Sequence, residues 1–160
     1  MTNDQIQKLF EKKIKKLDSK SKICFFDWVE SGVCLKEEMD IFAEWLNQIS
    51  EELLLSYIEK DGTVLSVITN QTESLCKESI LKSSWNIFKI RNVSKELYEI
   101  AIDRDPMVFL AIQNQTVDLC LFFLKRSPNA FSFINIVESP DYETTLKNLL
   151  EKKAILEALK

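Results

Sequence analysis

The sequence predicts an all-α protein built from tandem helix pairs of about 22 residues, stacked as a small solenoid. Three observations lead to this fold class. Apolar residues recur at helical spacing, Ser or Thr recurs where helices would begin, and the segments that start at residues 48, 70, 92 and 114 match one another in chemistry. With 160 residues, of which 46% are apolar, the chain is long enough to bury a sizeable core.

The first 47 residues lie outside the repeat, and we expect residues 1–47 to form a cap at its N-terminal end. Three helices are predicted there, near residues 4–17, 22–31 and 36–47. Their apolar side would be rich in aromatic residues, namely Phe25, Phe26, Trp28, Phe42 and Trp45. The lysines between Lys12 and Lys22 fit the solvated face of an amphipathic helix, although they could instead meet an acidic partner.

Each repeat is predicted to begin with a helix that is capped by a side-chain hydroxyl. The capping residues would be Ser50, Thr72, Ser94 and Thr116. Turn dipeptides such as Asp61-Gly62 and Asp105-Pro106 would end this helix, and a shorter helix would follow. The columns predicted to form the core include Leu53, Leu75, Leu97 and Leu119; Tyr57, Ser79, Ala101 and Phe123; Ile58, Ile80, Ile102 and Leu124; Leu65, Ile87, Phe109 and Phe131; and Ile68, Ile90, Ile112 and Ile134.

Helices this short cannot bury their apolar stripes alone, so neighbouring repeats must supply the core. We therefore expect residues 48–160 to form one array, joined to the N-terminal cap in a single compact unit. A closing C-terminal helix that contains Leu149, Leu150 and Leu156 would end the array.

The segments NQTESLCKESILKSSWNIFKI and NQTVDLCLFFLKRSPNAFSFI resemble the Asn-Gln-Thr…Leu-Cys repeats of the family called domain of unknown function 4116. The resemblance covers residues 48–135 best, and the units that begin at residues 48 and 92 depart from the motif with QIS and NVS. It implies tandem repeats, as found in intracellular bacteria and viruses, and it implies no activity. Asn70, Asn92 and Asn114 also fit the N-glycosylation pattern, but their regular phase favours hydrogen bonds to the turn between repeats.

Composition argues against most catalytic chemistry. The chain has no histidine, which removes Ser-His-Asp and Cys-His catalysis, and its two glycines cannot form a phosphate-binding loop. We expect no enzyme activity, cofactor or metal. The four cysteines lack a C-x-x-C pair, and Cys76 and Cys120 lie in apolar surroundings that favour buried, reduced thiols. Without a secretory signal or a long apolar run, the expected location is the cytoplasm, or the host cytoplasm if the protein is an effector.

Two sets of residues are candidate partner-binding sites. A basic column near the end of each first helix, Lys60, Lys82, Arg104 and Arg126, could contact phosphates, but we favour a structural role as cations in the last helical turn. Leu121 and Phe122 stand where the second repeat carries Lys77 and Glu78. This apolar face is either buried under the closing helix, which we favour, or presented to a partner.

The leading functional hypothesis is a non-enzymatic protein-binding module, such as a small inhibitor or effector of bacterial, phage or viral origin. The alternative is a ligand of nucleic acid or nucleoprotein that uses the basic column, or an acidic surface that mimics phosphates. A net charge of −4 lacks the basic excess typical of nucleic-acid binders, so a protein partner is expected, with neither nucleic acid nor membrane.

Overall fold

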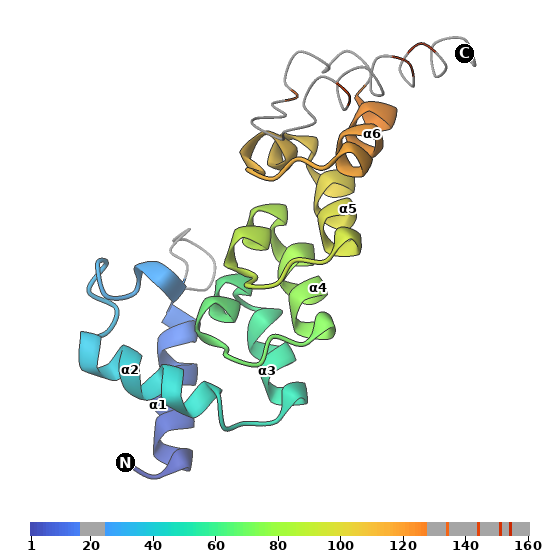
Figure 1. Ribbon diagram of the computed structural model, residues 1–160. Coiled ribbons are helices and arrows are strands. Elements are labelled where there is room, and N and C mark those ends of the chain that lie inside the picture. Colours follow the sequence, from blue (N-terminus) through green and yellow to red (C-terminus); the bar gives the residue numbers. More distant parts are fainter. Residues whose placement is uncertain (17–24, 128–133, 135–143, 145–150, 152–153, 155–160) are drawn as a thin grey trace. The chain divides into compact units, whose positions relative to one another are not determined.

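The computed structural model describes residues 1–16 and 25–127, together with residues 134, 144, 151 and 154. Every regular element in residues 1–16 and 25–127 is an α-helix or a 3-10 helix, which confirms the all-α prediction (Figure 1). The chain forms two compact units, Met1–Val93 and Ser94–Lys160. The first 47 residues therefore share a unit with the segment that follows them, and the boundary falls at residue 93.

The N-terminal part of the first unit contains helices α1 (Asn3–Lys16) and α2 (Lys36–Leu46) and the short 3-10 helix η1 (Phe25–Asp27). Of the three predicted helices, the first and third are present. The second, expected over residues 22–31, is wrong for residues 25–31, because only η1 and a series of turns occur there.

The chain reverses after η1 for two local reasons. The Trp28 carbonyl oxygen accepts hydrogen bonds from the N–H groups of Val33 and Cys34, at 2.8 and 3.2 Å, which closes a turn in place of a helix. Gly32 has a φ of +71°, a left-handed conformation that side-chain-bearing residues rarely adopt. The backbone after η1 is therefore a compact turn in place of the predicted helix.

Aromatic rings hold the N-terminal helices to the rest of the first unit, and Phe10 of α1 lies at the centre of the cluster. Its side chain is fully buried. The ring centre of Phe10 lies 5.0–6.0 Å from those of five other aromatic residues, which are Phe25, Trp28, Phe42, Trp45 and Tyr57. Tyr57 belongs to the next helix, so this cluster joins residues 1–47 to the segment that follows.

An ion pair also joins α1 to α2. Lys13 Nζ donates to Glu38 Oε2 at 2.6 Å and to the Val33 carbonyl oxygen at 2.9 Å. Glu38 Oε2 also accepts from the Leu35 N–H at 2.7 Å, next to the first turn of α2. The hydrogen bonds from Lys13 and Leu35 lower the pKa of Glu38.

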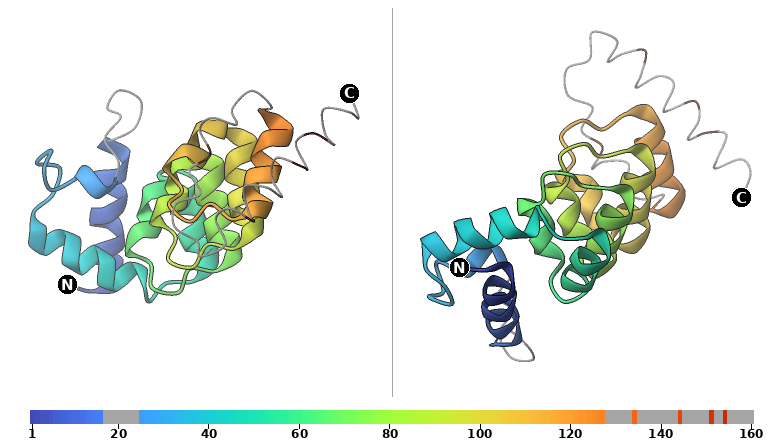
Figure 2. Two further views of the ribbon diagram at one scale, coloured as in Figure 1. Left: turned by 45° about the horizontal axis from the view of Figure 1, so that its top comes forward. Right: turned by 90° about the horizontal axis from the view of Figure 1, so that it is seen from below.

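The remaining helices are short and alternate between two types. The first unit continues with α3 (Glu51–Ile58), η2 (Gly62–Val67), α4 (Glu73–Lys82) and η3 (Ser84–Lys89). The second unit contains α5 (Lys95–Arg104), η4 (Pro106–Ala111) and α6 (Val117–Arg126). Helices α3 and α4 lie side by side, as do α5 and α6 (Figure 2).

Each of the helices α3 to α6 begins after a hydroxyl-bearing N-cap, as predicted. The hydroxyl oxygens of Ser50, Thr72, Ser94 and Thr116 accept hydrogen bonds from the backbone N–H three residues later, at 3.3–3.4 Å. These bonds satisfy one of the amides that a helix leaves without a partner in its first turn.

The predicted core columns are buried at nearly every described position, including Ser79 and Ala101 in the column of Tyr57. Leu53 and Ile134 are the exceptions, since both are only half-buried. Leu53 lies outside the core because α3 turns the neighbouring Leu54 into it instead. Phe131 lies outside the described residues.

A buried polar network fixes the passage from α4 to η3. Ser79 Oγ donates to the Gly62 carbonyl oxygen at 2.7 Å, and Asn86 Nδ2 donates to the Ser79 carbonyl oxygen at 2.9 Å. A Cβ atom at position 62 would overlap the Asn86 amide. Glycine is therefore required at residue 62 for close approach.

Leu75→Ala should lower the free energy of unfolding by ~2–5 kcal/mol, because the Leu75 side chain is buried and its removal leaves a cavity in the core. Leu53→Ala removes the same atoms from a half-buried site and should cost clearly less. Urea denaturation of both variants measures the difference. Equal midpoints would show that the two leucines are packed alike, contrary to the structure.

Candidate functional site

The Asn-Gln-Thr motif has a structural role that its glutamine carries. Gln71 Nε2 donates to the carbonyl oxygens of Leu65 and Lys89, at 2.9 and 3.0 Å, and Gln71 Oε1 accepts from the Arg91 N–H at 2.9 Å. One side chain thus joins the end of η2 to the segment after η3. In the second unit, the buried Gln115 donates to the Phe109 carbonyl oxygen at 3.1 Å.

The cysteine of the motif is also structural. The Sγ atoms of Cys76 and Cys120 each lie 3.9 Å from the carbonyl oxygen of the preceding glutamine, Gln71 and Gln115. Both thiols are free and buried, as predicted. Burial raises the pKa of Cys76, and it raises that of Cys120 to about 11, so neither is an activated nucleophile.

The prediction that Asn70 and Asn92 hold the turns is wrong for the part of the chain that the structure describes. Both side chains are exposed, and the turn hydrogen bonds come from Gln71 and from Asn47. Asn47 Nδ2 donates to the carbonyl oxygens of Ala43 and Val67, at 2.7 and 2.8 Å. Gln71 is longer and one residue nearer α4, and it reaches the backbone carbonyls of Leu65 and Lys89, whereas Asn70 and Asn92 are exposed. Asn114 is exposed as well.

The basic column is exposed, and its first-unit members are close to groups of their own helices. Lys82 Nζ lies 3.7 Å from Glu78 Oε1 in α4. Lys60 Nζ lies 5.4 Å from the ring centre of Tyr57, but it follows the end of α3 instead of lying in its last turn.

In the second unit, Arg104 and Arg126 lie in the last turns of α5 and α6. The Arg126 guanidinium pairs with Asp103 of α5 and lies 3.4 Å from the ring centre of Phe122. The hydrogen bond from Arg126 lowers the pKa of Asp103. Arg126 therefore joins α6 to α5, which is a structural use of this position.

The apolar face of α6 is partly covered. Leu121 and Phe122 are half-buried and pack, together with Ile134, against a core cluster in the second unit. The cluster consists of Ile102, Phe109, Ile112, Leu119, Cys120 and Phe123. The helix expected to cover this face, with Leu149, Leu150 and Leu156, lies outside the described residues.

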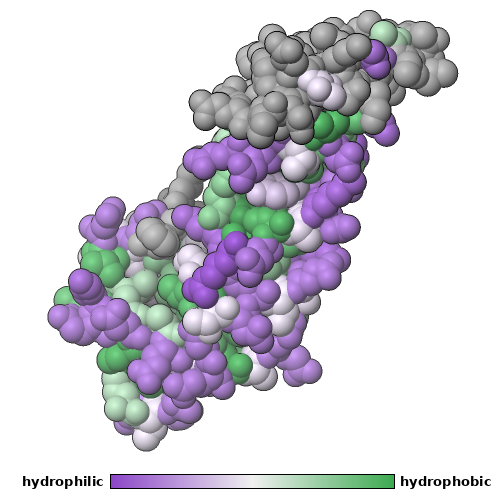
Figure 3. All heavy atoms as spheres, viewed as in Figure 1, coloured by the Kyte–Doolittle hydropathy of each residue, from purple (hydrophilic) through white to green (hydrophobic). Residues whose placement is uncertain are grey.

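Two exposed aromatic residues in the described part of the first unit were not anticipated from the sequence. Trp85 and Phe88 of η3 are 48% and 45% exposed, and their ring centres lie 5.9 Å apart. Leu81 at the end of α4 is 46% exposed. We call these three residues the η3 apolar surface. Figure 3 shows that hydrophobic residues reach the molecular surface among hydrophilic ones.

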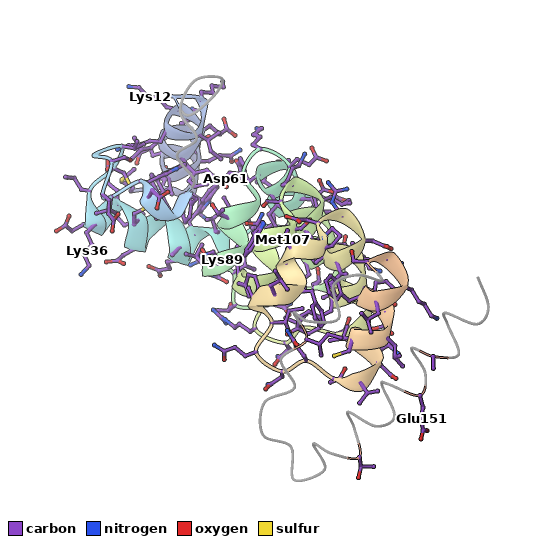
Figure 4. All side chains as sticks on the ribbon, turned by 90° about the horizontal axis from the view of Figure 1, so that it is seen from above. Lys12, Lys36, Asp61, Lys89, Met107 and Glu151 are labelled. Atoms are coloured by element: carbon purple, nitrogen blue, oxygen red, sulfur yellow. The ribbon has the colours of Figure 1, made fainter. Side chains whose placement is uncertain are left out.

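A periodic signal for this surface was present in the sequence. Met107 and Leu110 of η4, in the second unit, stand one repeat after Trp85 and Phe88 in the sequence. The same interval separates the starts of the α-helices. Met107 and Leu110 are 58% and 36% exposed. Apolar residues thus recur in columns that the core does not use. Met107 is labelled in Figure 4.

A small polar pocket adjoins the same segment of the first unit. It has a volume of about 160 Å³ and is lined by Thr69, Asn70, Gln71, Ile90, Arg91 and Asn92. Arg91 is its only charged lining residue. The lining thus combines a guanidinium with three amides and a hydroxyl.

No family model matches the chain, and no curated protein or solved structure matches it. The resemblance to the family of domain of unknown function 4116 therefore stays a prediction from the motif. Among the described residues, no group of histidine, cysteine or carboxylate side chains could hold a metal ion. Within the same residues, none of the helices has both the length and the apolar character needed to cross a membrane.

Gln71→Ala should destabilise the first unit by about 1–3 kcal/mol, because two carbonyl oxygens and one N–H lose their partner. Asn70→Ala, next to it and exposed, is the matched control and should leave the urea midpoint unchanged. A midpoint that responds to Asn70→Ala and not to Gln71→Ala would return the role to asparagine.

Phe122→Glu should destabilise the second unit strongly, since it places a carboxylate against the core cluster. Met107→Glu introduces the same charge at a 58% exposed position and should have little effect. Thermal unfolding of the two variants makes the comparison. If Phe122→Glu were as stable as the parent, Leu121 and Phe122 would become candidates for partner binding.

Proposed function

We propose that the chain is a non-enzymatic protein-binding module, in which short helix pairs stack as a small solenoid of tandem repeats. The architecture is supported by α3, α4, α5 and α6, which begin at residues 51, 73, 95 and 117 after equivalent caps. Each of the first three is followed by a 3-10 helix. Arrays of this kind use the side chains outside their core to bind partners.

The observation that carries the binding function is the η3 apolar surface. Trp85 and Phe88 keep nearly half of their surface exposed, while Trp28 and Trp45 are buried. Tryptophan and other aromatic residues are the side chains that contribute most to protein interfaces. A role as inhibitor or effector in a bacterial, phage or viral setting is compatible with such a surface.

A nucleic-acid ligand is the second candidate, and one observation favours it. Residues 79–93 carry Lys82, Lys89 and Arg91 and no carboxylate, and they include the two exposed aromatic rings. Bases stack on such rings, and cations contact phosphates. The net charge of −4 weighs against this candidate, so we place it second.

The test is a quantitative pull-down from a native lysate, with and without nuclease. The double variant Trp85→Ser/Phe88→Ser should capture less of the protein partner than the parent does, by a factor of more than about ten. The control is the double variant Leu35→Ser/Ile41→Ser, which also removes two exposed apolar side chains. Leu35 precedes α2 and is 67% exposed, and Ile41 lies in α2 and is 37% exposed. It should keep the partner.

Two results would contradict the proposal. Equal capture by both double variants would show that the η3 apolar surface is not the binding site. Capture that disappears with nuclease in the parent protein would identify nucleic acid as the ligand. Circular dichroism and melting temperature verify that each variant is folded.

A further inference from the structure

The polar pocket beside η3 offers donors that the fold does not consume. The Gln71 amide is occupied by backbone groups. Arg91 is exposed, and one of its terminal nitrogens lies 3.4 Å from the Thr69 carbonyl oxygen, which orients the guanidinium over the pocket. The exposed amides of Asn70 and Asn92 also line the pocket. A guanidinium and two carboxamides can together donate several hydrogen bonds to one anion.

The charged residue that lines the pocket is basic, in a chain that is acidic overall. Residues 62–72 carry no charged side chain, and residues 79–93 carry three basic ones and no acidic one. These two segments supply all the lining residues.

The carboxylates closest in sequence to these segments are engaged elsewhere. Asp61 accepts from the N–H groups of Phe25 and Thr63, Glu73 pairs with Lys77, and Glu78 pairs with Lys82. The charge that remains at the pocket is that of Arg91, which favours an anion.

We infer that this pocket binds the side-chain carboxylate of an Asp or Glu in a peptide segment of the partner, whose neighbouring apolar residue packs on Trp85 and Phe88. The inference rests on the proposed function and names the chemistry of the partner. A carboxylate matches the planar guanidinium of Arg91, and the two asparagines supply further N–H donors. The aromatic pair lies three to six residues before Arg91 in the chain, a separation that a short peptide is long enough to span.

A protein carboxylate fits this pocket better than a nucleic-acid phosphate. Phosphate-backbone binding draws its affinity from several cations that act together. Here a single guanidinium lines the pocket, and Lys82, near it in sequence, is paired with Glu78. The recognition that remains is one anion beside an apolar anchor, which is the pattern of an acidic peptide motif.

The test is selection of peptides from a random phage-displayed library on the full chain, followed by affinity measurement with the selected peptide made synthetically with an amidated C-terminus. Peptides selected on the parent protein should be enriched in Asp or Glu next to an apolar residue. Arg91→Glu should abolish that enrichment or reverse it toward Lys and Arg. Arg91→Gln should weaken binding of the synthetic peptide about ten-fold.

Lys36→Glu and Lys36→Gln are the matched controls. They change the net charge by the same amount as Arg91→Glu and Arg91→Gln do. Lys36 is an exposed residue of α2 that lies away from Lys89 at the end of η3 (Figure 4). Both should select and bind peptides like the parent protein. Because Arg91 contributes its backbone N–H to the Gln71 bond, side-chain substitution leaves that bond in place, and melting temperatures verify folding.

Three outcomes would overturn the inference, and they separate it from the proposed function. Selected peptides without acidic residues that still require Trp85 and Phe88 would leave the protein-binding function intact and remove the carboxylate site. Equal loss of affinity in Arg91→Gln and Lys36→Gln would show that the loss comes from the change in net charge and not from a site at Arg91. Tighter binding of single-stranded oligouridine than of the selected peptide would identify nucleic acid as the occupant.

Discussion

The structure depends on satisfying the backbone groups between short helices. Helices α3 to α6 have at most ten residues, so a large share of their amides and carbonyls lies in first and last turns, where no intrahelical partner exists. Hydroxyl caps satisfy the N-terminal ends. The segments between helices rely on Gln71, Asn47, Ser79 and Asn86, which reach from one segment to the backbone of another. These bonds fix where η2 and η3 lie, and the side chains of η3 that remain exposed follow from that placement.

The N-terminal segment solves the same problem with aromatic packing. Phe10 contacts rings from η1, α2, α3 and the turn between η1 and α2, and it therefore holds together elements that are far apart in sequence. Asp61 adds a polar link, because its carboxylate caps η2 through the Thr63 N–H at 2.9 Å and also accepts from the Phe25 N–H at 2.5 Å. Residues 1–47 consequently share a core with α3 and η2.

Local features of the sequence predicted the all-helical character of the chain, whereas features that require a distant partner were not predicted. The hydroxyl caps and buried columns follow from spacing along one helix, and the structure contains both. The turn after Phe25 depends on Gly32 and on the Trp28 carbonyl oxygen, and the sequence pattern did not indicate either contribution. Gln71 and Gln115 hold the same place in the two NQT segments, and the other two repeats have Ile49 and Val93 there. Only the structure shows that the Gln71 amide donates to two carbonyl oxygens. Trp85 and Phe88 lie outside the predicted core columns, and only the structure shows that both rings are exposed.

The buried thiols give this chain its own reporters of local opening. Cys34 and Cys76 lie in the first unit and Cys120 in the second, each buried and each with a raised pKa. A thiol in this state reacts with an alkylating reagent only when its surroundings transiently unfold, so its labelling rate measures the free energy of that opening. In a variant with Ser in place of Cys24, the modified peptides would separate by mass. The three rates would then rank the aromatic N-terminal segment, the Gln71 region and the second unit by how often each one opens.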